Sequence, residues 1–341
     1  MNMSMNNLLE RIEAAQTKLN FSGAVFVKQG DSILAHRSYG YANRSDEIPN
    51  KVNTRLGIAS GCKIFTAIAI AQLVDQGKLS FDATLKQCLQ VSFPYFEDNI
   101  TVHHLLTHTS GVPDYFDEEE MDDFEQLWIT TPMYHVRRLH DFLPLFQHKP
   151  MKFPVGSRFH YNNTGFILLG LIVEQASGMS FSDYVQKNIF DKAGMMDSGY
   201  FESDRLPGRT ALGYIDLPDG GWRTNIYALP AKGGSDGGAY VTVADMARLW
   251  EALMNHQLLS KETTDLLLSV HTEAEKDFSY GYGVWLQKNA EGSLHYVLMG
   301  YDPGVNFRTV FYPDRALSIV VCSNRSGGAY EMLSTIEDGW N

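Results

Sequence analysis

Residues 58–77 have the sequence Ile-Ala-Ser-Gly-Cys-Lys-Ile-Phe-Thr-Ala-Ile-Ala-Ile-Ala-Gln-Leu-Val-Asp-Gln-Gly. The apolar spacing predicts a helix over 62–76, which Gly77 ends. Ser60 and Lys63 are three residues apart at its start and therefore share one face. A helix N-terminus stabilises negative charge, so Ser60 is a candidate nucleophile and a neutral Lys63 a candidate proton acceptor. The alternative is a capping serine with a solvated lysine, and this motif alone leaves both open.

Strands are expected near both ends of the chain. The β-rich runs 23–28 and 32–36 predict a hairpin, and further strands are expected at 282–287, 305–312 and 317–322. The middle of the chain is mostly helix and loop. We therefore expect an α+β fold, in which an antiparallel sheet built from both termini is flanked by helices and carries a mostly helical inserted lobe.

The expected organisation is a single domain over 1–341 with two lobes. An α/β lobe holds about 1–80 plus 226–341, and a mostly helical lobe holds about 81–225. A cleft between two lobes is a favoured place for a ligand.

Composition excludes several classes of protein. With 28 Lys+Arg and 40 Asp+Glu the net charge is −12, which disfavours nucleic acid as a partner. The longest aliphatic run, 166–173, is far shorter than the ~20 residues that span a bilayer, so no transmembrane segment is expected. Residues 1–7 show no signal peptide, which predicts a cytoplasmic protein unless an export signal was removed. Three cysteines (Cys62, Cys88, Cys322) are too few for a disulfide framework. The oligomeric state stays open.

A Y-x-N motif occurs twice. Tyr161-Asn-Asn163 lies on a loop before a predicted helix, in the lobe opposite Ser60, where a phenol could face the serine across the cleft. Tyr41-Ala-Asn43 follows the hairpin and is interpreted as turn chemistry.

Four other motifs receive structural interpretations. Gly233-Gly-Ser-Asp-Gly237 matches the G-x-S-x-G elbow, but it lacks the strand before and the helix after, so a flexible loop is favoured over Ser235 as nucleophile. His104 and His108 have zinc-helix spacing without the glutamate, which favours a structural role over metal. Cys62 has no histidine close in sequence, so a cysteine nucleophile is the weaker alternative to Ser60. The acidic run 117–123 is expected to be a solvated surface.

Taken together, these motifs resemble the serine β-lactamase and penicillin-binding-protein superfamily, in the branch of class C β-lactamases, D-alanyl-D-alanine carboxypeptidases and related esterases. The resemblance is carried by segments spread along nearly the whole chain: 21–26, 40–44, 58–63, 71–79, 100–111, 154–165 and 237–248. It implies the β-lactamase/transpeptidase-like fold, with Ser60, Lys63 and Tyr161 as catalytic residues. It also implies Asn163 as a substrate-orienting residue, and no metal or organic cofactor.

The chain departs from this family at its third motif, usually Lys-Thr-Gly or His-x-Gly on a strand at the cleft edge. The corresponding residues are Leu298-Met-Gly300, followed by Tyr301, whose backbone N–H the resemblance assigns to the oxyanion site. Leu298 in place of a cation removes a partner for a substrate carboxylate. His295 is expected on the opposite face of the strand, and Arg308 is the alternative cation.

The expected function is a serine hydrolase that forms an acyl-enzyme on Ser60 with ester or amide substrates, β-lactams and D-alanyl peptides included. Lys63, Tyr161 or both would take the proton, and the partner would be a small-molecule or peptide substrate. The alternative is a penicillin-binding or sensor protein of the same fold with little or no turnover, an alternative that Leu298 motivates.

Overall fold

The computed structural model describes residues 5–274, 277–288 and 292–340. Its centre is an eight-stranded sheet in which every pairing is antiparallel. The strands are β1 (Gly23–Gln29), β2 (Ser32–Tyr39), β9 (Thr272–Glu273), β10 (Phe278–Tyr280), β11 (Trp285–Lys288), β12 (Leu294–Asp302), β13 (Val305–Tyr312) and β14 (Leu317–Ser323). Their order, β2-β1-β14-β13-β12-β11-β10-β9, places the N-terminal hairpin beside the last strand. The expected sheet from both termini and the fold class are confirmed.

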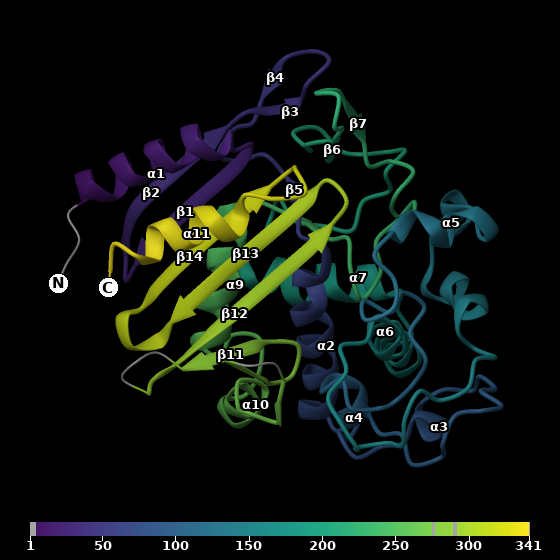
Figure 1. Cartoon of the computed structure of the whole chain (residues 1–341). Coiled ribbons are helices and arrows are strands. Elements are labelled where there is room, and N and C mark those ends of the chain that lie inside the picture. The colour runs from purple at the N-terminus through teal and green to yellow at the C-terminus, as the bar shows by residue number, and fades with distance from the viewer. Residues whose placement is uncertain (1–4, 275–276, 289–291, 341) are drawn as a thin grey trace.

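Helices cover both faces of the sheet (Figure 1). They are α1 (Met5–Leu19), α2 (Lys63–Asp75), α3 (Leu85–Cys88), α4 (Val102–Leu106), α5 (Leu127–Thr130), α6 (Asn163–Ser177), α7 (Phe181–Val185), α8 (Asp191–Ala193), α9 (Val243–Met254), α10 (Lys261–Leu267) and α11 (Ala329–Glu337). The terminal helices α1 and α11 pack together on one face, whereas α9 packs against β1 and β14 on the other. Helices α3 to α6 lie to the side of the sheet, and α2 stands between them and the strands (Figure 1).

The remaining short elements connect these layers. Three small sheets pair β3 (Tyr41–Asn43) with β4 (Ile48–Pro49), β5 (Leu56–Gly57) with β8 (Tyr240–Val241), and β6 (Tyr214–Asp216) with β7 (Trp222–Thr224). Short segments of tighter or wider helix are η1 (Ala59–Cys62), η2 (Phe124–Gln126), η3 (Met133–His135), η4 (Leu139–Leu145), η5 (Gln186–Phe190) and η6 (Pro313–Arg315).

Helix α2 is apolar all round, and it is buried all round. Its residues from Lys63 to Leu73 are all buried between the sheet and the helical part, as expected for a helix without a polar face. Gly77 follows α2 with φ of +68°, which confirms the predicted stop. The predicted strand at 282–287 starts later than expected: β11 begins at Trp285, because Gly283 adopts φ of +70° directly against the Lys63 carbonyl.

Candidate active site

Ser60 lies on the tight turn η1, immediately before α2. The preceding residue, Ala59, has φ of +46°, a left-handed conformation that is strained for any residue with a Cβ. The turn is pressed against the sheet: a Cβ on Gly61 would lie 2.4 Å from the Phe307 ring, and one on Gly300 would lie 2.0 Å from the Ile58 carbonyl oxygen. Only glycine fits at these two positions, and the close contact that they permit holds Ser60 beside β12.

Lys63 is 2% exposed, and its ammonium nitrogen makes three polar contacts. Nζ lies 2.8 Å from Asn163 Oδ1, 2.7 Å from the carbonyl oxygen of Asp236 and 3.0 Å from Ser60 Oγ. Two of these partners can only accept. A neutral amine can donate its two N–H groups to them, which leaves its lone pair for the Ser60 hydroxyl. This geometry suits a general base for Ser60.

Asp114 fixes which way the Asn163 amide points. Its carboxylate accepts the backbone N–H groups of Asn163 and Thr164 at 2.8 and 2.9 Å, and Asn163 Nδ2 donates to the Phe116 carbonyl at 3.2 Å. The amide oxygen is therefore left for Lys63. Burial raises the pKa of Asp114 to about 7, although the backbone donors and Lys63 act in the opposite direction.

Tyr161 lies on the loop before α6 and lines the cavity with Ser60. Its ring stacks on Trp285 with centroids 5.9 Å apart, and Lys63 Nζ lies 4.8 Å from its ring centroid. Burial raises the pKa of Tyr161 well above its ordinary value, while its hydrogen bond with Ser60 acts against that rise. Tyr161 is therefore a protonated phenol in the free protein, placed to pass a proton rather than to hold a standing negative charge.

The glycine loop 233–238 forms another part of the site. Thr66 Oγ1 on α2 donates to the Ser235 carbonyl at 2.5 Å, and the next carbonyl, that of Asp236, accepts from Lys63. The Ser235 side chain itself is fully buried and faces Gly170 of α6. The interpretation of this motif as a loop rather than a nucleophile elbow is confirmed.

A cavity of about 780 Å³ opens above Ser60. It is lined by Tyr161 and Asn163 from the helical side and by Gly300 and Tyr301 from β12. The Tyr301 side chain is 63% exposed, so only its backbone is fixed at the site.

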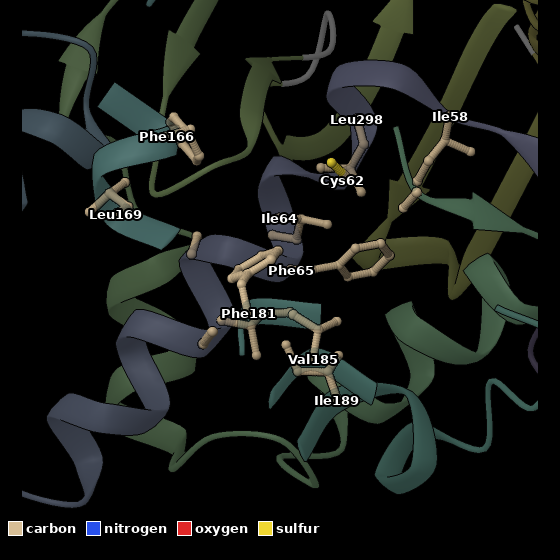
Figure 2. Packing of buried hydrophobic residues seen from close by; sticks show 14 of the residues in the cluster. Ile58, Cys62, Ile64, Phe65, Phe166, Leu169, Phe181, Val185, Ile189 and Leu298 are labelled. Carbon is tan, nitrogen blue, oxygen red and sulfur yellow. The ribbon is translucent and has the colours of Figure 1, made fainter. Parts of the chain in front are cut away.

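The expectation that the Leu298 side chain contacts substrate is wrong. Leu298 is 2% exposed and belongs to the apolar core, where it lies beside Cys62 (Figure 2). Among the described residues, Met299, Gly300 and Tyr301 line the cavity, whereas Leu298 does not. Side chains alternate along a strand, so Leu298 faces the same way as Gly300, against the buried turn η1.

The acidic run 117–123 is only partly a solvated surface. Asp117 is buried and pairs with Lys152, while Glu118, Asp122 and Asp123 line the cavity. Asp117, Glu119 and His160 also place three ligand atoms within 4.8 Å of one another, as a metal site could. Because the Lys152 ammonium already neutralises Asp117, we assign no metal to these residues.

The other candidates from the sequence have structural surroundings. His104 completes the capping box of α4, and His108 is buried among aromatic rings behind Tyr161. His295 stacks on Tyr312, away from the cavity, whereas Arg308 lines it with its guanidinium 4.8 Å from the Tyr330 ring. Cys62 is buried, and burial raises the pKa of its thiol to about 12, which makes it a poor nucleophile.

Two groups that organise the site were not predicted from the sequence: the Asp236 carbonyl, which accepts from Lys63, and Asp114, which orients Asn163. The Asp236 carbonyl is a backbone group and has no residue-type signal. Asp114 is distant from Asn163 in sequence, and no spacing rule connects them. The Gly233-Gly-Ser-Asp-Gly237 pattern did indicate the segment that contains Asp236, but only as a loop.

A family model described as Beta-lactamase matches residues 9–336. The chain belongs to the beta-lactamase family. The resemblance drawn from its motifs to the serine β-lactamase and penicillin-binding-protein superfamily is therefore confirmed.

Relatives in this family carry several names. A penicillin-binding protein of Bacillus subtilis is 30% identical over 329 residues, which cover 92% of this chain and 70% of the relative. Esterase EstB of Burkholderia gladioli is 31% identical over 202 residues, 57% of this chain and 50% of the relative. The crystal structure of a penicillin-binding protein from Bacillus halodurans has a TM-score of 0.92 and 58% identity, covering 96% of this chain and 99% of that one. These likenesses support serine-hydrolase-type activity on amide or ester substrates.

Within the described ranges, no single helix combines the length and apolar character needed to cross a membrane. Asn163–Ser177 and Phe181–Ala193 meet that test only as a pair, which is bent by 75°.

Proposed function

We propose that this protein is a serine hydrolase that cleaves neutral esters or amides through an acyl-enzyme on Ser60. The observation that carries the proposal is the set of contacts of Lys63 Nζ. Asn163 Oδ1 and the Asp236 carbonyl accept the two N–H groups of the neutral amine. Its lone pair therefore points toward Ser60 Oγ, which lies 3.0 Å from Nζ.

The reaction runs in two steps. Ser60 Oγ attacks the substrate carbonyl carbon while its proton passes to neutral Lys63, and the backbone N–H groups of Ser60 and Tyr301 stabilise the oxyanion. Collapse of the tetrahedral intermediate breaks the bond to the leaving group and forms the Ser60 ester. Water then attacks the carbonyl carbon of this ester while Lys63 takes a proton from the water. The bond between the acyl carbon and Ser60 Oγ breaks, that proton passes to Ser60 Oγ, and the acid is released.

Tyr161 acts as the proton donor to the leaving group in this mechanism. Its phenol is protonated and hydrogen-bonded to Ser60, so it can deliver a proton to the departing alkoxide or amine and be re-protonated by Lys63. Lys63 and Tyr161 thus share one proton path.

The charges around the cavity support a neutral substrate. Glu118, Asp122 and Asp123 line it, whereas Arg223 is paired with Glu125 at 2.6 Å. Leu298, where the family commonly has a cation, is buried in the core. Arg308 also lines the cavity, with its guanidinium over the Tyr330 ring. A substrate carboxylate that does not reach Arg308 would leave water without a matching partner, at a cost that a neutral ester avoids.

Turnover of a chromogenic short-chain ester tests the proposal. We expect the wild type to release p-nitrophenol, Ser60→Ala to lose this activity, and Ser235→Ala to keep it, since Ser235 is buried away from the cavity. A penicillin incubated in parallel should be turned over more slowly than the ester. If penicillin acylates Ser60 and neither the ester nor the penicillin is turned over, the protein is a penicillin-binding protein without turnover, and the proposal of a hydrolase is wrong.

A further inference from the structure

His108 lies directly behind the candidate active site, and the mechanism above gives it no role. It contacts three consecutive residues of the loop that carries Tyr161. Its carbonyl oxygen accepts the backbone N–H of His160 at 2.9 Å. Its ring lies 4.5 Å from the Tyr161 ring, centroid to centroid, and its Nδ1 accepts the backbone N–H of Asn162 at 3.0 Å.

The hydrogen bonds of His108 define its tautomer. Nδ1 must carry a lone pair to accept the Asn162 N–H, so the ring proton is on Nε2. Nε2 lies 3.2 Å from the Tyr280 hydroxyl oxygen and donates to it. Burial holds the pKa of His108 well below its ordinary value. The imidazole is therefore neutral and accepts on one side while it donates on the other.

The backbone at His108 is held in a conformation that histidine seldom adopts. Its φ is +57°, a left-handed value that costs free energy in a residue with a Cβ and persists only where surrounding contacts enforce it. His108 follows the last turn of α4 and is fully buried. The chain thus accepts strain at a residue whose ring lies against Tyr161.

We propose that His108 is a positioning residue for catalysis, which holds the Tyr161 phenol in reach of Ser60 and Lys63. It fixes the loop backbone on both sides of Tyr161 through His160 and Asn162 and supports the phenol ring between them. His108 acts only through Tyr161. The inference rests on the proposed serine-hydrolase function and adds to it the residue that orients its proton donor.

A double-mutant cycle tests this inference with the intact protein and a p-nitrophenyl ester. His108→Asn is the informative variant, because asparagine tolerates the left-handed backbone and its Oδ1 can accept the Asn162 N–H, while the supporting ring is lost. In the wild-type background we expect kcat to fall about 10–100-fold with KM little changed, since a small misplacement of a reacting group has effects of this size. In a Tyr161→Phe background the same change should alter kcat by less than about threefold, because no phenol is left to orient.

His104→Asn is the matched control, since His104 caps α4 on the same segment and is not part of the proton path. Should His108→Asn not fold, Tyr280→Phe removes the acceptor for Nε2–H and should give a smaller loss that also vanishes with Tyr161→Phe. Equal losses in both backgrounds, or no loss in either, overturn the inference. Wild-type turnover that survives Ser60→Ala would instead contradict the proposed function.

Discussion

Among single residues, the direction in which a few side chains point decides what they do. Leu298 is the clearest case, because its neighbours Met299 and Gly300 line the cavity while its own side chain fills the core beside Cys62. A residue in this position affects stability first and substrate choice only indirectly.

Leu298→Ala should therefore lower the free energy of unfolding by about 2–5 kcal/mol, as expected when a buried leucine is truncated. The ratio of kcat/KM for a penicillin to that for a neutral ester should not change. Leu298→Met is the control, with an expected loss below about 1.5 kcal/mol. Urea unfolding measures the free energy of unfolding, and kcat/KM for a penicillin and for the ester gives the ratio. An unchanged stability with a shifted ratio would place Leu298 in the substrate site after all.

Asp302 gives a prediction about pH. Burial, together with the Asp236 carboxylate, raises the pKa of Asp302 to about 8, whereas an aspartate in an unfolded chain titrates near 4. Between these values the folded protein binds the additional proton, so this group's stabilising contribution is present at low pH and is lost as the pH rises toward 8.

We expect Asp302→Asn, which is neutral at every pH, to match the Tm of the wild type at about pH 4 and to exceed it at about pH 8, with a difference that grows between these values. Thermal unfolding at the two pH values measures this. A difference in Tm that is the same at both would show that the Asp302 carboxyl does not titrate in this range.

At the scale of elements, the contact between β12 and η1 holds the site together. Gly300 of β12 approaches the Ile58 carbonyl so closely that a Cβ there would lie 2.0 Å from the oxygen. The oxygen is a backbone atom, and the position of a Cβ is set by the backbone of its own residue, so neither can swing away as the end of a flexible side chain would.

Gly300→Ala should therefore move β12 away from Ser60 and misplace the Tyr301 N–H, which we assign to the oxyanion. Removing one such donor typically lowers kcat about 10²–10³-fold, and we expect a loss of this size together with a lower Tm. Gly208→Ala is the matched control, because nothing lies within 4 Å of a Cβ at that position. Measurements of kcat with the p-nitrophenyl ester and of Tm for both variants test this prediction. Full activity in Gly300→Ala would exclude the assigned oxyanion donor.

At the scale of the whole molecule, the sequence predicted the features that depend on local spacing. The end of α2 at Gly77 is confirmed because capping is decided within one turn. The antiparallel sheet from both termini followed from the positions of the β-rich runs. Ser60 and Lys63 were found together for the same local reason, since they share one helical turn.

What the sequence could not predict depends on contacts between distant segments. Which face of β12 packs on η1 decides the direction of Leu298, and no alternation rule fixes a face without knowledge of its neighbour. Asp117 was expected in solvent, yet it is buried because Lys152, distant in sequence, pairs with it. The role of the Asp236 carbonyl belongs to the backbone, so residue types could not indicate it.

The central claim is that Ser60 becomes acylated, and intact-protein mass after rapid acid quench of an ester reaction tests it most directly. We predict a transient mass increase equal to one acyl group, which peptide mapping places on the Ser60 peptide, which Ser60→Ala abolishes and Ser235→Ala retains. An adduct on Ser235 or Cys62, or turnover by the Ser60→Ala variant at the wild-type rate, would contradict the account.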